Sequence, residues 1–279
     1  MIKRAIQIFF AFLMLTATYY YLYKYQKIGS VKALSAQKII PFDTILLIIN
    51  YNHPYYQSRD FLEGIYKEPF PHQLFYGEKE NPRINTLATH QGWFAHRVLA
   101  DAMQRHPYYE GYLMIQDDCL VNYWNLARFD RHKIWINESI PRELSKVSHP
   151  WVWWAKECGA SAVKDSIKSL SSGYLQQLER NCSPDTIVTG AADFVYIPAR
   201  YRKEFILLSS IFDKTFIEIA IPTIAFCLDT KENIEFTHFL WDYSLNNDFD
   251  TSLDWIHPLK FSNIANQNLV QNYLKKIGV

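Results

Sequence analysis

Two adjacent carboxylates, Asp117 and Asp118, follow directly on the apolar run of residues 111–115. Burial beside a core disfavours charged carboxylates unless a cation compensates them. Mg²⁺ and Mn²⁺ take one or two protein carboxylates, and phosphate oxygens and water complete their coordination. The pair therefore favours a divalent metal site for a diphosphate, while a pair of loop aspartates that caps a helix is the structural alternative.

Other residues of catalytic type lie far along the chain. His257 and Lys260 occur together in a His-Pro-Leu-Lys sequence, where a surface histidine before a turn proline is the simpler interpretation. Glu218 is a lone acid in the apolar segment 216–223, so it is either paired or a candidate general base. Asp193, in Gly-Ala-Ala-Asp, competes with Glu218 for that role, and a buried, hydrogen-bonded carboxylate is the alternative for both acids.

The elements that must position these residues alternate along the first half of the chain. Strands are predicted over residues 44–50, 72–76 and 111–115, and helices over 56–66 and 92–105. This alternation predicts an open parallel sheet with helices on both faces, which binds ligands at the carboxyl ends of its strands. Tyr51, Asn52 and His53 after the first strand would then lie beside the Asp pair.

The second half of the chain is less regular. Helical segments are expected over residues 164–180, 201–211 and 215–228, with Pro222 interrupting the last of them. A strand is expected around residues 194–196. Trp151, Trp153 and Trp154 are interpreted either as core residues or as a sugar-stacking platform.

The sequence Gly-Tyr-Leu-Met-Ile-Gln-Asp-Asp resembles the DxD or xDD site of GT-A-fold glycosyltransferases, and the pattern covers roughly residues 43–262. The resemblance implies an α/β, GT-A-like open, mostly parallel sheet flanked by helices. It makes Asp118 a metal ligand and places Asp117 near the donor ribose. His257 would complete the metal site and Lys260 would grip the diphosphate. Gln116 replaces the acid that often comes first.

Transfer of a sugar from a nucleotide donor, with UDP-sugars expected first, to a glycan or glycoprotein acceptor is the activity that this resemblance implies. The metal would be Mn²⁺ or Mg²⁺, and the imidazole of His257 favours Mn²⁺. Glu218 or Asp193 would serve as base if the reaction inverts the anomeric centre, and Asn50, Tyr51 and Asn52 would meet the nucleotide base. The alternatives are a degenerate transferase that organises a partner enzyme in the membrane and, third, a metal-dependent phosphoesterase.

An uncharged run of residues 5–23 follows Lys3 and Arg4 and is long enough to cross a hydrocarbon core of roughly 30 Å. It predicts a signal-anchor after a cytoplasmic tail of residues 1–4, then a stem over 24–41 and a lumenal catalytic domain over 42–279. A single-pass type II protein of the Golgi or endoplasmic reticulum is expected. The sequons at Asn137 and Asn181 fit lumenal exposure.

Composition narrows the classes further. Lys plus Arg number 29 against 28 Asp plus Glu, which argues against a nucleic-acid binder with a basic surface. The four cysteines form no CxxC pair, so a zinc ribbon is not expected. Cys158 and Cys182 would bridge in an oxidising compartment, and all four would be buried thiols in a reducing one.

Overall fold

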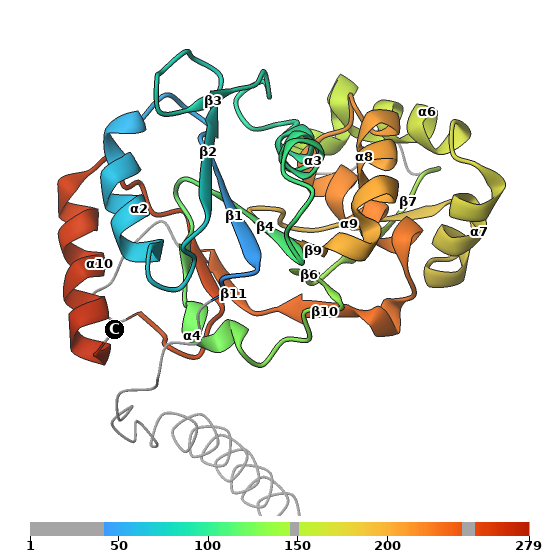
Figure 1. Ribbon diagram of the computed structural model, residues 1–279. Helices are drawn as coiled ribbons and strands as arrows, with labels where there is room; N and C mark the ends of the chain where they lie inside the picture. Colours follow the sequence, from blue (N-terminus) through green and yellow to red (C-terminus); the bar gives the residue numbers. More distant parts are fainter. Residues whose placement is uncertain (1–41, 146–150, 242–248, 279) are drawn as a thin grey trace, which may run out of the picture. The chain divides into compact units, whose positions relative to one another are not determined.

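A seven-stranded sheet forms the centre of the computed structural model, which describes residues 42–145, 151–241 and 249–278 (Figure 1). Across the sheet, the strands are β10 (Ile234–Thr237), β6 (Ile134–Asn137), β9 (Phe194–Pro198), β4 (Gly111–Gln116), β1 (Ile45–Asn50), β2 (Gln73–Gly77) and β3 (Asn85–Thr86). β9 is antiparallel to its neighbours, and the other pairs are parallel. The expectation of a large, mostly parallel sheet is confirmed.

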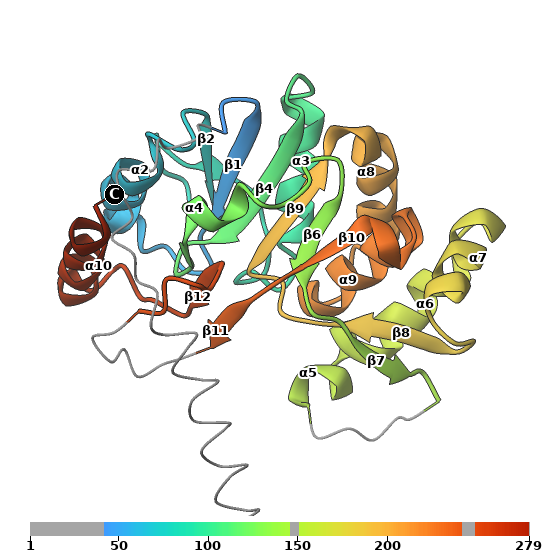
Figure 2. The same ribbon diagram turned by 90° about the horizontal axis from the view of Figure 1, so that it is seen from below.

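Helices flank this sheet, as also expected (Figure 2). The helices of the described residues are α2 (Arg59–Tyr66), α3 (His96–Arg105), α4 (Tyr123–Leu126), α5 (Val152–Ala155), α6 (Ala162–Lys168), α7 (Ser172–Asn181), α8 (Arg202–Ile211), α9 (Ile217–Leu228) and α10 (Ile264–Ile277). Buried side chains of α3, α8 and α9 share one core with Ile48 of β1 and Met114 of β4. Of the described residues, those between 42 and 269 form one compact unit, and residues 270–278 belong to a second.

The two central strands explain why the site residues meet. Every side chain of β1 and of β4 is buried, which accounts for their continuous apolar sequences. The strands pair in parallel from Ile45 opposite Gly111 to Asn50 opposite Gln116. Because both strands end at the same level, the residues that follow them lie next to each other at the carboxyl edge of the sheet.

Three predicted helices differ from the observed ones. The helix predicted over 92–105 begins at His96, because Gly92 has a φ of 85° and belongs to a turn ahead of it. The helix predicted over 164–180 is divided into α6 and α7 by a break at residues 169–171. Pro222 was expected to interrupt a helix, yet α9 continues through it.

The backbone around Pro222 explains why α9 is not broken. Proline has no N–H to donate to the carbonyl four residues earlier, here that of Glu218. The N–H of Gly190 donates to this carbonyl instead, at 2.9 Å. The lost helical bond is thus replaced by a bond from another segment, which also fixes the backbone of Glu218.

Two small sheets complete the described strands. β11 (Phe239–Trp241), β12 (Trp255–His257) and β5 (Leu120–Val121) form one, and β7 (Ile140–Glu143) pairs with β8 (Thr186–Thr189) in the other. None of the helices in the described ranges is long and apolar enough to cross a bilayer. The predicted anchor over residues 5–23, its flanking tail and the stem over 24–41 lie outside those ranges.

All four cysteines and both sequon asparagines lie within the described ranges. All four cysteines are free thiols, so the bridge between Cys158 and Cys182 is not formed. Asn137 is buried in β6. The side-chain amide of Asn181 donates to the carbonyls of Phe226 and Asp229, at 2.8 and 2.7 Å. The fold therefore uses or buries both sequon asparagines.

Candidate active site at the carboxyl edge of the sheet

The turns after β1 and β4 are bonded directly to each other. Asn50 Nδ2 donates to Gln116 Oε1 at 2.8 Å and to Asn52 Oδ1 at 3.3 Å. The backbone N–H of Asn52 donates to Asp117 Oδ1 at 3.2 Å, and the N–H of Asp117 donates to the Asn50 carbonyl at 2.9 Å. Residues predicted from two separate strand ends therefore form one structure, with Asp117 oriented by the loop after β1.

His257 reaches the Asp pair on a different strand. β12 pairs antiparallel with β5, which follows the Asp pair immediately, and sets Ile256 opposite Leu120. The N–H of Leu259 donates to the Asp118 carbonyl at 2.6 Å. As a result, His257 Nδ1 lies 3.1 Å from Asp118 Oδ1. The Lys260 ammonium contacts the other oxygen of that carboxylate, Oδ2.

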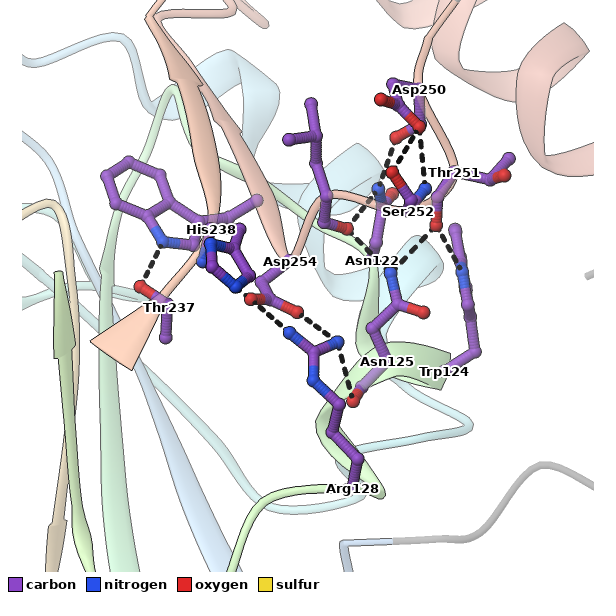
Figure 3. Close-up of polar contacts among 12 residues, drawn as sticks. Asn122, Trp124, Asn125, Arg128, Thr237, His238, Asp250, Thr251, Ser252 and Asp254 are labelled. Carbon is purple, nitrogen blue, oxygen red and sulfur yellow. Dashed lines mark hydrogen bonds and ion pairs between the residues drawn. The ribbon is translucent and has the colours of Figure 1, made fainter. Parts of the chain in front are cut away.

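Polar side chains of α4 and the residues next to it anchor the segment that precedes β12 (Figure 3). Asn122 and Asn125 each donate to the Leu253 carbonyl, at 2.8 and 2.7 Å. Arg128 forms a bidentate ion pair with Asp254, and both N–O distances are 2.7 Å. Asp254 is fully buried. These contacts hold β12, and hence His257, in place beside Asp118.

Two more acids face the same place. Asp193 lies just before β9, and its carbonyl accepts the N–H of Gln116 at 3.0 Å, at the end of β4. Its Oδ1 is 3.6 Å from His257 Nε2, so the imidazole has a carboxylate on each side. Glu218 is the second residue of α9. Its pKa responds to the charges of Asp193 and His257, which places it in the same cluster.

The electrostatics of the cluster are dominated by buried acids. Burial, followed by the charge of Asp118, raises the pKa of Asp117 to about 8. Burial, followed by the charge of Asp193, raises the pKa of Glu218 to about 8. Burial also raises the pKa of Asp193. Without further positive charge, the carboxyls of Asp117 and Glu218 hold protons near neutral pH.

Asp118 and His257 behave in the opposite way. Burial alone would raise the pKa of Asp118, but His257 and Lys260 lower it. Burial opposes the charged imidazole of His257, yet Asp193 and Asp118 raise its pKa. Although they are close, Asp118 Oδ1 and His257 Nδ1 are both buried atoms without a hydrogen-bond partner in the described structure, as is Asp193 Oδ2. Asp118 and His257 are therefore paired by charge when the imidazole is protonated, without a well-aligned hydrogen bond between Oδ1 and Nδ1.

Tyr51 differs from the other predicted site residues because its side chain lies in the core. It is 1% exposed, its hydroxyl is 3.2 Å from Ser58 Oγ, and its ring meets Tyr56 edge-on at 5.1 Å. Asn50 is also fully buried, whereas Asn52 is partly exposed. Contact between Tyr51 and a nucleotide base does not fit this packing, and Asn50 acts through the loop that it holds.

The tryptophan-rich run is core-like rather than an open platform. Trp154 is buried. The ring of Trp153 stacks on Phe216 at 4.5 Å with an interplanar angle of 9°, and Lys156 Nζ lies 4.0 Å from its centroid. A ring has two faces, and these partners are too close to share one. Trp153 therefore has both faces covered, and a sugar would have to displace one partner to stack there.

Sequence reasoning missed the anchor formed by Asn122, Asn125 and Arg128. Their three-residue spacing places them on one side of a helical turn just after the Asp pair. This spacing is the local pattern from which the anchor could have been predicted. It also missed Trp241, whose ring centroid lies 4.7 Å from that of His257. No local pattern links Trp241 to His257, because pairing between β11 and β12 brings them together.

This chain is thus a mixed α/β protein with acids and a histidine at the carboxyl edge of a mostly parallel sheet. It is 23% identical over 148 residues to "Probable glycosyltransferase STELLO1" of Arabidopsis thaliana, and 19% identical over 147 residues to "Probable glycosyltransferase STELLO2" of the same plant. Each match covers 50% of this chain and 19% of the relative. No family model matches the chain. This distant similarity supports a glycosyltransferase-like protein.

Proposed function

We propose that this chain is a metal-dependent glycosyltransferase that uses a nucleotide sugar, with UDP-sugars as the first donors to test. The observation that carries the proposal is the approach of Asp118 Oδ1 to His257 Nδ1, at 3.1 Å and with no hydrogen bond between them. Two ligands at right angles on one cation, each about 2.1 Å from it, lie roughly 3.0 Å apart. A carboxylate oxygen and an imidazole nitrogen at this spacing fit a small divalent cation once the imidazole has lost its proton.

The protein would supply part of the coordination. No group of three or more His, Cys, Asp or Glu suited to a metal ion occurs among the described residues. Asp118 and His257 would therefore hold Mn²⁺ or Mg²⁺ together with diphosphate oxygens and water, as such cations are commonly held. When bound, the cation would stabilise the charge that develops on the departing diphosphate.

The proposal gives the other residues of the cluster separate roles according to their positions. Lys260 is 55% exposed beside Asp118, so it can meet a diphosphate at the same edge. Asp117, oriented by the N–H of Asn52, would contact the donor ribose. Asp193 lies on the far nitrogen of His257, which suits a counter-charge that orients this ligand. That assignment leaves Glu218 as the preferred base for the acceptor hydroxyl.

The compartment is part of the proposal. Residues 5–23 would anchor the chain as a type II protein, with the domain in the lumen of the Golgi or endoplasmic reticulum and a glycan or glycoprotein as acceptor. What supports this is the uncharged run behind Lys3 and Arg4. Protease protection of the domain in intact microsomes, and digestion after detergent, is the expected result.

Thermal shift of the full-length chain with nucleotide sugars, with and without Mn²⁺, tests the proposal. At least one donor should stabilise the protein with metal and fail without it, and Asp118→Ala should lose this effect. Asp165→Ala, which removes an exposed acid of α6, is the matched control and should keep it. Equal stabilisation of the Asp118→Ala protein would refute the metal assignment.

A second candidate function has one observation in its favour. Lys260 already gives Asp118 a cationic partner, as expected in a degenerate transferase that no longer binds metal and organises a partner enzyme. Donor hydrolysis separates the two functions. Turnover of a UDP-sugar that requires Mn²⁺ supports the enzyme. No turnover with any donor, and no metal-dependent stabilisation, supports the degenerate form.

A further inference from the structure

A cavity of about 1040 Å³ is lined by the segment that precedes α3, by residues 155–158, by α6 and by the end of α8 with the residues after it. Pockets for small ligands usually measure 300–1,000 Å³, so this one is large enough for a ligand of several rings. Neither Asp118 nor His257 lines it. The cavity is therefore separate from the proposed metal position and has no role in the function described so far.

The wall of the cavity is bonded to the segment that carries Glu218. Cys158 and Trp93 both line the cavity. The Cys158 carbonyl accepts the N–H of Phe216, and the Trp93 carbonyl accepts the N–H of Ile217, each at 2.8 Å. Glu218 follows these two residues directly. A ligand in the cavity would thus lie against the segment that holds the proposed base.

The chemistry of the lining is mixed in a way that suits sugars. Trp93 and Phe94, both partly buried, supply aromatic surface beside Lys156 and Arg97, which lie 4.4 and 4.6 Å from their ring centroids. The Ser161 hydroxyl can donate and accept hydrogen bonds, whereas those of Ser169 and Ser210 donate to the carbonyls of Asp165 and Leu207, at 3.1 and 2.6 Å, and are left to accept. Such alternation of apolar and hydroxyl surface matches a carbohydrate better than a lipid or a purely apolar ligand.

The charges of the lining are nearly balanced. Two lysines and three acids line the cavity. Two of the acids have partners outside it, because Asp213 pairs with Arg97 at 2.7 Å and Asp165 pairs with Lys168 at 2.9 Å. A balanced lining gives no strong attraction to a polyanion, so the ligand that fits best is uncharged.

We infer that this cavity binds a neutral oligosaccharide whose terminal hydroxyl is the acceptor of the transfer. The inference rests on the proposed function and names its acceptor class. In the reaction, the acceptor oxygen forms a bond to the anomeric carbon of the donor sugar. The bond from that carbon to the diphosphate oxygen breaks, and the diphosphate leaves with the electron pair. The acceptor proton passes to Glu218.

Blocking the cavity with a bulky side chain tests the inference. Ser161 and Ser169 are exposed on the lining, and Ser172, also exposed, lies at the start of α7 away from it. Ser161→Trp and Ser169→Trp should fill the cavity, and Ser172→Trp is the matched control. Binding of neutral hexasaccharides (cellohexaose, chitohexaose, mannohexaose and xylohexaose) and of a hyaluronan hexasaccharide is measured on the full-length chain by titration calorimetry.

At least one neutral hexasaccharide should bind the parent chain. Its affinity should fall at least tenfold in Ser161→Trp and Ser169→Trp and stay within twofold in Ser172→Trp, with Mn²⁺-dependent donor stabilisation kept in all three. Retained donor stabilisation shows that a variant is folded. The inference is overturned if the parent binds none of the neutral chains, if it prefers hyaluronan, or if both cavity variants bind like the parent. If the chain binds a hexasaccharide but never binds a donor with Mn²⁺, the assignment of the cavity as an oligosaccharide site is kept and the proposed transferase function is refuted.

Discussion

His257 lies between two carboxylates, with Asp118 on Nδ1 at 3.1 Å and Asp193 on Nε2 at 3.6 Å. A metal-bound histidine commonly presents its other nitrogen to a carboxylate, which fixes the ring and raises its basicity. If His257 binds a cation as proposed, the two distances separate the ligand carboxylate of Asp118 from the orienting carboxylate of Asp193. They also explain why Asp193, a plausible base from sequence, is placed better for a supporting role.

Replacing Asp193 by Asn should weaken Mn²⁺ binding by about tenfold to a hundredfold, because the orienting charge on His257 is lost. Affinity is measured by titration calorimetry with Mn²⁺ alone. Asp165→Asn, which removes an exposed acid of α6, should leave the affinity unchanged. If Asp193 is instead the base, its Asn variant will bind Mn²⁺ normally and lose turnover.

The metal-free protein should lose stability as the pH rises from about 5 to about 8. In the folded chain the pKa of Asp117 and that of Glu218 are about 8, well above the ordinary carboxyl range near 4. Over this window the folded state binds more protons than the unfolded state, so raising the pH favours unfolding. The melting temperature in EDTA should fall by several degrees between pH 6 and pH 8.5.

Mn²⁺ should reverse this trend by replacing the protons, and its affinity should rise with pH over the same window. Glu218→Gln should flatten the metal-free profile, whereas Glu179→Gln, on the exposed side of α7, should not. A metal-free protein that becomes more stable between pH 6 and pH 8.5 would contradict the raised pKa values.

Arg128→Ala should destabilise the fold by about 3 kcal/mol, because it leaves the carboxylate of Asp254 buried without its charge partner. Urea unfolding measures the change. Arg83→Ala, which removes an exposed partner of Asp60, should leave the free energy of unfolding almost unchanged. Equal costs for the two variants would show that the Arg128 pair does not anchor β12.

Gly190→Ala should destabilise the protein by roughly 1–3 kcal/mol, because a Cβ there would lie 2.8 Å from the Glu138 carbonyl oxygen. The strain would also disturb the N–H that bonds the Glu218 carbonyl. Urea unfolding measures the free energy, and Gly173→Ala, where a Cβ meets no atom within 4 Å, is the control. An unchanged Gly190→Ala protein would mean that the loop moves aside without cost.

The central part of the fold was readable from local patterns, and the assembly of the site was not. β1 and β4 have continuous apolar sequences that periodicity detects, so the edge beside Asp117 could be predicted. The position of His257 depends on pairing between β12 and β5, far apart in the chain, which no local spacing encodes. The burial of Tyr51 could not be predicted for the same reason, because tertiary packing brings the rings of Tyr56 and Phe75 against it.

The contact of Lys260 with Asp118 joins residues 142 positions apart. Such a long loop must close before this contact can form, and non-local contacts tend to form late in folding. A nascent or truncated chain that stops before β12 would have the Asp pair and most of the sheet but neither the imidazole nor the ammonium. Competence to bind a cation at the proposed site would then require the finished, folded chain, so a metal-binding assay would also report that synthesis and folding are complete.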